Sequence, residues 1–229
     1  MSEKNWNVLS FKLLIIAIIQ FIVLSTIAMI FYTGGTKLDP DASSYSFWAN
    51  FFSDLGRTKS LSGKPNLISC VIYIISGTIL AISITPFTIS ISHFFKEGEL
   101  EKKLRILLVF FGFITSSFWI AAMITPWDLY GNTHLLFGII YTTTGVIVLL
   151  LLAIMIFLND SYPNKYAFIL IYYFGIYFFN LIIVILLRYN PNTVSSLIVQ
   201  ATFQKITLYL FLGVFIYLGN GALKFNKLC

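Results

Sequence analysis

Six long apolar stretches decide the solvent in which this chain can fold. They cover residues 11–31, 66–90, 106–125, 134–157, 166–187 and 195–218. A transmembrane helix needs about 20 consecutive, predominantly apolar residues to cross the hydrocarbon core of a bilayer. The sequence therefore predicts an all-α polytopic membrane protein, in which residues 1–229 form a single domain built as a bundle of six transmembrane helices.

Composition argues against a soluble domain and against a nucleic-acid partner. Hydrophobic residues make up 58% of the chain and charged residues 10%, a balance too apolar to hide inside one soluble core. The net charge of +6 is spread over short connections and tails, without the clustered basic stripe that nucleic-acid binding requires. The lipid bilayer is therefore the expected partner.

The first apolar stretch is also too long for a cleaved signal peptide, because it exceeds the apolar core of about 7 to 15 residues that such a peptide has.

The distribution of the basic residues predicts the orientation. If the N-terminus lies inside, the inner segments carry Lys4, Lys12, Lys96, Lys102, Lys103, Arg105, Lys165, Lys224 and Lys227. The outer segments then carry the smaller set Lys37, Arg57, Lys59, Lys64 and Arg188. Because positive residues are enriched on the cytoplasmic side, this pattern predicts a multi-pass protein of the cell membrane with both termini in the cytoplasm.

The connection between the first two stretches is the longest in the chain and has a pattern of its own. Phe47, Phe51 and Leu55 recur at helical spacing, which is typical of an amphipathic helix. The polar residues of the segment fall on another face: Asn50, Ser53, Asp54 and Arg57. The pattern predicts a short helix lying in the membrane interface, with Gly56 at its C-terminal end, where a left-handed residue is common.

Lys205 is the most unusual residue of the chain, because it lies in the middle of the apolar segment "ATFQKITLYLF". It is about ten residues into the last stretch, which at about 1.5 Å per residue places it near the middle of a core about 30 Å thick. A charge at that depth normally faces the bundle and finds a partner or a water-filled cavity. Lys205 therefore either holds helices together or binds a ligand. A retinal Schiff base is disfavoured with six predicted helices, and no cofactor is expected.

Other polar residues collect at the predicted outer ends of the helices. They are Asn66, Asp128, His134 and Gln204, together with Asp54 in the long connection. This placement predicts an outward-facing polar cavity that binds an anionic group such as a lipid headgroup or a small anion. Lys205 would supply the charge and be held by Asp54 or Asp128 when the site is empty, while His134, Asn66 and Gln204 would hydrogen-bond the ligand. Transporter, sensor and binding module stay open as roles.

Two alternatives remain beside anion binding. Asp128 could orient His134 as a general base, which would make the chain a membrane-embedded lipid hydrolase with these two residues as its catalytic candidates. The polar groups could instead only fix helix packing in a structural or accessory subunit. The chain has two histidines, too few for a zinc site of three histidines, so no metal site is expected.

Four short stretches carry a resemblance to a known family. "NFFSDLGRT", "PNLIS", "TPWDLYGNTH" and "QKITLYLFLGVF", in this order, resemble the uncharacterised prokaryotic membrane-protein family called domain of unknown function nine-nine-eight. The resemblance implies matching positions at Asp54, Gly56, Asp128 and His134. The family's Glu-Arg pair in the last helix is replaced here by Gln204 and Lys205, so a cation is kept and a carboxylate is lost.

The layout is also similar, more distantly, to the Frag1/DRAM/Sfk1 group of membrane proteins, some of which handle lipids or glycolipids. This similarity implies an arrangement of helices and no activity.

Overall fold

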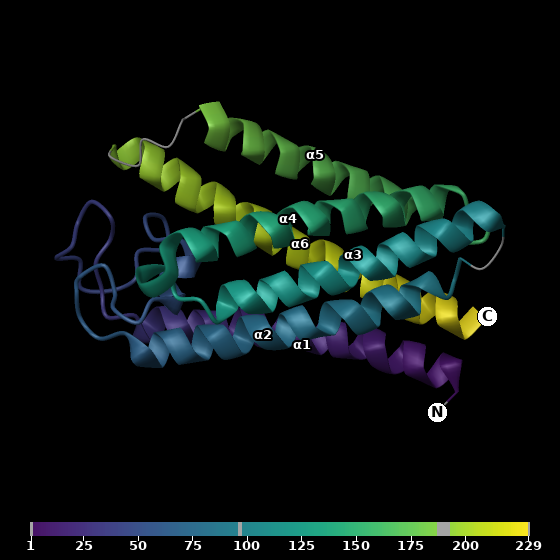
Figure 1. Ribbon diagram of the computed structural model, residues 1–229, viewed down its shortest axis with the longest axis horizontal. Helices are drawn as coiled ribbons and strands as arrows, with labels where there is room; N and C mark the ends of the chain where they lie inside the picture. The colour runs from purple at the N-terminus through teal and green to yellow at the C-terminus, as the bar shows by residue number, and fades with distance from the viewer. Residues whose placement is uncertain (1, 96–97, 187–192, 229) are drawn as a thin grey trace.

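The computed structural model describes residues 2–95, 98–186 and 193–228, and within these ranges the protein is all-helical (Figure 1). Its long helices are α1 (Glu3–Phe31), α2 (Leu67–Ser92), α3 (Glu99–Met123), α4 (Trp127–Phe157), α5 (Lys165–Leu186) and α6 (Val194–Leu228). A short 3-10 helix, η1 (Phe52–Gly56), lies between α1 and α2. Each predicted stretch coincides with one long helix, which confirms the all-α fold class.

Five of the helices, α1, α2, α3, α4 and α6, are long and apolar enough to cross a membrane. The described apolar part of α5 is Lys165–Phe179, which is shorter than the span of about 20 residues that a bilayer core needs. Large apolar side chains point outward from the bundle, among them Ile16, Phe113 and Tyr172. Helices that are apolar all round suit a lipid environment, so the structure confirms apolar helices that could span a membrane.

The six long helices pack as a closed ring in chain order. Each contacts the next, and α6 returns to contact α1. The two termini lie at one end of the bundle, here called the terminal end, and the connection from α1 to α2 lies at the other (Figure 1). Residues 32–66 of that connection are called the long loop, and their side of the bundle the loop end. Aromatic rings fill the ring centre: Phe87 contacts Phe11 of α1 and Phe215 of α6.

The interfacial helix predicted over residues 47–55 is not present. In its place η1 enters the mouth of the helix ring, where it packs against α1, α2, α4 and α6. Asp54, predicted to lie on a polar face, is 8% exposed, and Leu55 is fully buried. Gly56 does not have a positive φ; a Cβ there would lie 3.0 Å from the Tyr73 ring. Close packing against α2, and not a left-handed turn, is the reason for glycine at this position.

Candidate functional site

Phe52 closes the mouth of the helix ring at the loop end. Its side chain is 2% exposed and its ring lies 6.1 Å from that of Phe21, 6.4 Å from that of Tyr73 and 5.9 Å from that of Tyr209. These neighbours belong to α1, α2 and α6. The Phe52 backbone N–H donates to Gln204 Oε1 at 2.8 Å. One residue of the long loop therefore contacts three of the long helices at once.

Lys205 lies directly beneath this part of the loop and is 1% exposed. Its ammonium donates to the backbone carbonyl of Asn50 and, at 3.2 Å, to that of Ala201 in its own helix. The ring centroids of Tyr45, Phe47 and Phe52 lie 5.7, 5.2 and 6.0 Å from Nζ, distances at which an aromatic face attracts a cation. Among the described residues no carboxylate forms an ion pair with Lys205 within 4.0 Å. The hydrogen-bond and ring partners of the ammonium are therefore neutral.

Asp54 is linked to Lys205 through one residue. Asn50 accepts from Lys205 with its backbone carbonyl and donates with its side chain to Asp54 Oδ2 at 3.3 Å. The Phe51 N–H also donates to this carboxylate, at 2.8 Å. Burial raises the pKa of Asp54, although the Phe51 hydrogen bond and the charges of Arg57 and Lys205 act to lower it. Of the two predicted acidic partners of Lys205, Asp54 is the one that lies in its cluster.

The raised pKa of Asp54 makes stability depend on pH. The folded protein holds this proton more tightly than the unfolded chain, so the contribution of Asp54 is largest below its ordinary pKa of 3.8 and falls as the pH rises above it. We expect Asp54→Asn, which keeps an oxygen acceptor, to abolish this loss. Its melting temperature, measured in detergent, should rise relative to wild type as the pH increases from about 3.5 towards 7.

Asp41→Asn is the matched control, because Asp41 is an exposed aspartate of the same loop. The Asp41→Asn protein should follow the wild-type pH profile. A pH profile of Asp54→Asn that runs parallel to wild type would contradict the assignment.

Asn66 and Asp128 form hydrogen bonds with the second half of the long loop. The Asn66 side chain donates to the Arg57 carbonyl at 2.9 Å and accepts from the Thr33 N–H at 3.3 Å. Asp128 accepts from the Thr58 N–H at 3.0 Å, from the Thr58 hydroxyl at 2.5 Å and from the Lys59 N–H at 3.0 Å. Asp128 is therefore bound to the loop, and it does not serve as the partner of Lys205.

His134 stands apart from the other predicted site residues. Its Nδ1 lies 2.7 Å from the Thr125 carbonyl oxygen, and because a carbonyl only accepts, Nδ1 carries the proton. The ring meets Trp127 edge-on at 5.6 Å. Asp128 makes its bonds to the loop, so the structure does not show the hydrogen bond by which Asp128 would orient His134 as a general base. Within the described part of the chain there is no group of three or more His, Cys, Asp and Glu residues that could hold a metal.

Apart from His134, the predicted site residues thus lie at the loop end, where they bind the loop itself. Lys205, Gln204 and Asp54 form one cluster with the segment around Asn50, and Asn66 and Asp128 bind the loop farther along. The sequence interpretation missed Asn50 as a central residue. Its signal in the sequence is weak, since the pattern places it only on the polar face of the expected interfacial helix, yet it is fully buried.

No known protein-family model matches this chain, and comparisons with curated proteins and with solved structures found no significant match. The resemblance to the family called domain of unknown function nine-nine-eight therefore stays a prediction.

Proposed function

We propose that this chain is a multi-pass protein of the cell membrane that binds an anionic group, either a lipid headgroup or a small anion, at Lys205. In this proposal α5 also crosses the bilayer, both termini lie in the cytoplasm and the loop end faces outward. One observation carries the proposal: the ammonium of Lys205 is 1% exposed and its hydrogen-bond acceptors are backbone carbonyls.

A buried ammonium with neutral partners is better explained by a ligand than by packing alone. Removing a charge from water costs several kcal/mol even after relaxation, whereas a neutral donor would bind the Asn50 carbonyl without that cost. Hydrogen bonds between an ammonium and an anion are about twice as strong as neutral ones. Asp54 reaches Lys205 only through Asn50, and burial raises the pKa of its carboxyl. The cluster therefore favours an anionic ligand, since ionisable residues within transmembrane segments commonly mark substrate or ion pathways.

In this proposal the segment from Tyr45 to Arg57 is a lid. The Asn50 carbonyl occupies the direction from which an anion would accept from Lys205, and Phe52 fills the mouth of the ring above it. Binding requires both groups to move outward. Transport, sensing and simple capture all share this step.

The test compares anion binding by wild type and Lys205→Met. Purified protein is titrated with inorganic phosphate, acetate and dioleoylphosphatidylglycerol, and binding is followed by calorimetry. We expect the substitution to weaken binding of the preferred probe by about tenfold or more, the effect of losing a strong charge-assisted contact. The melting temperature should stay equal or rise, because replacing a buried charge by an apolar side chain is often neutral or stabilising.

Lys37→Met, at an exposed lysine of the same loop, is the matched control and should leave binding unchanged. An affinity for the preferred probe that is unchanged in Lys205→Met, or weakened equally in Lys37→Met, would contradict the role given to Lys205.

A second candidate function, that of a structural or accessory subunit, is favoured by a different observation. Gln204, Asn66 and Asp128 all bind the backbone of the long loop, which is what residues with a purely structural role would do. In that case the Lys205→Met protein should bind each probe as wild type does. It should also still associate with its partner proteins in the membrane. The third candidate, a lipid hydrolase, has no comparable support, because the described residues show no hydrogen bond between Asp128 and His134.

A further inference from the structure

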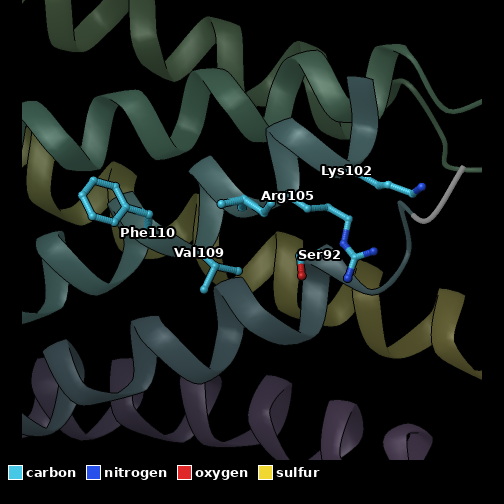
Figure 2. A pocket seen from close by; sticks show the side chains of 6 residues that line it. Ser92, Lys102, Arg105, Val109 and Phe110 are labelled. Carbon is cyan, nitrogen blue, oxygen red and sulfur yellow. The ribbon is translucent and has the colours of Figure 1, made fainter. Parts of the chain in front are cut away.

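A pocket of about 560 Å³ lies at the terminal end, far from the long loop. The described residues that line it are Ser92, Lys102, Arg105, Ile106, Val109 and Phe110. Ser92 is the last residue of α2, and the others follow one another along the first half of α3. Figure 2 shows the Arg105 guanidinium beside Ser92, with the Lys102 side chain extending from the same helix.

The pocket has a cationic part with an unused donor. Arg105 Nε is buried and has no hydrogen-bond partner among the residues that the structure describes, although a buried donor normally has one. Lys102 donates to Glu99 at 2.7 Å, but both side chains are largely exposed, at 59% and 81%. Such a surface pair contributes little, so Lys102 can exchange Glu99 for another anion. Glu101 also lies in the first turn of α3, yet no acid is among the described lining residues.

The remaining wall of the pocket is apolar and open to lipid. Ile106 is 70% exposed and Phe110 is 55% exposed. Because side chains three or four residues apart lie on one helix face, Lys102, Ile106 and Phe110 form a line along α3. The cations come first, and the exposed apolar side chains follow farther along the helix. This is the order of headgroup and acyl chain in a phospholipid.

The position of the cations near the start of α3 agrees with this order. Arg105 is six residues after Glu99, the first residue of α3, a distance of about 9 Å along the helix. We propose that the pocket binds a phospholipid with an anionic headgroup from the leaflet at the terminal end. Its phosphate accepts from Arg105 and Lys102, and one acyl chain lies along Ile106, Val109 and Phe110. This site is independent of the one proposed at Lys205.

Native mass spectrometry of the full-length protein, with dioleoylphosphatidylglycerol added at increasing concentration, tests the proposal. We expect Arg105→Gln and Lys102→Gln each to weaken lipid binding about fivefold, the effect of one basic residue near an anionic headgroup. Phosphatidylcholine with the same acyl chains should bind more weakly to wild type. Lys102 is exposed, so its variant keeps the experiment decisive even if Arg105→Gln fails to fold.

Lys103→Gln is the matched control, because it removes the same charge one residue away from an exposed position outside the described lining. It should bind the lipid as wild type does. Equally weakened lipid binding in Lys103→Gln would show that binding depends only on net charge, and would overturn the proposal. Inorganic phosphate is added as a competitor: displacement of the lipid at equal concentration would show a site for free phosphate and would also overturn the proposal.

Discussion

Phe52→Ala is expected to lower the free energy of unfolding by about 3–5 kcal/mol, the usual cost of truncating a buried phenylalanine. The ring is 2% exposed and contacts one aromatic residue on each of α1, α2 and α6. Its removal leaves a cavity at the mouth of the helix ring that the rigid helices cannot close. Reversible unfolding of the purified protein in mixed micelles measures the loss.

Trp48→Ala is the matched control for this prediction. Trp48 is a larger aromatic residue of the same loop, but it is 57% exposed, so its truncation should cost less than about 1 kcal/mol. The hydrogen bond from the backbone of residue 52 to Gln204 survives in Phe52→Ala, because it does not use the side chain. Similar losses for the two variants would mean that the loop does not hold the helices together.

The existence of the long helices could be predicted, whereas their ends could not. Apolar composition marks the part of a helix that lipid surrounds, and the helix continues beyond it. The first apolar stretch begins at residue 11, but α1 begins at Glu3, where the Ser2 side chain accepts from the Asn5 N–H. A hydropathy pattern is insensitive to such a cap, which depends on hydrogen bonding by a polar residue.

The depth predicted for Lys205 in the bilayer is also affected by helix ends that hydropathy does not define. Counting from the start of the apolar stretch placed it near the middle of the bilayer. However, α6 has 35 residues, about 52 Å at the usual rise and much more than the core thickness. The first residue of the helix therefore does not mark the membrane surface. The long loop also descends to meet Lys205, so the ammonium finds a carbonyl of the loop.

The residues of the candidate site were recognisable because polar side chains are rare in so apolar a chain. Their partners were not. Lys205 and Asn50 are 155 positions apart, and Asp128 and Thr58 are 70 apart, and in both pairs the loop contributes backbone atoms. Every residue has a carbonyl and almost every residue an N–H, so such partners leave no trace in the sequence. The helical spacing of Phe47, Phe51 and Leu55 was misleading because it does not say which surface covers the apolar side.

Gly35→Ala is expected to have the second large effect, about 2–5 kcal/mol of lost stability. Gly35 has a φ of +84°, and a Cβ there would lie 2.1 Å from the backbone nitrogen of Ser62. The left-handed conformation costs an alanine about 1–2 kcal/mol, and forced displacement of packed atoms adds about 1–3 kcal/mol. The Gly35 carbonyl also accepts from the Asn50 side chain at 2.9 Å. Strain at Gly35 therefore reaches the residue that binds both Lys205 and Asp54.

Gly63→Ala separates the two costs. Gly63 has a similar φ of +81°, but nothing lies within 4 Å of the added Cβ, so only the conformational cost of about 1–2 kcal/mol remains. The melting temperature of Gly35→Ala should be clearly the lower of the two, and equal values would contradict the contact with Ser62.

Anion affinity gives Gly35→Ala a second measurable consequence. If the loop is a lid, the open form is a minor population in wild type. The apparent affinity for the anion is then reduced in proportion to the fraction of molecules that are open. Loosening the segment around Asn50 should then raise the affinity for the anion that wild type prefers, even as the melting temperature falls. A loop with only a structural role predicts that stability falls and no Lys205-dependent binding is gained. Calorimetric titration of Gly35→Ala, with the double variant Gly35→Ala/Lys205→Met as control, therefore distinguishes a lid from a fixed cap, because only a lid makes binding and stability change in opposite directions.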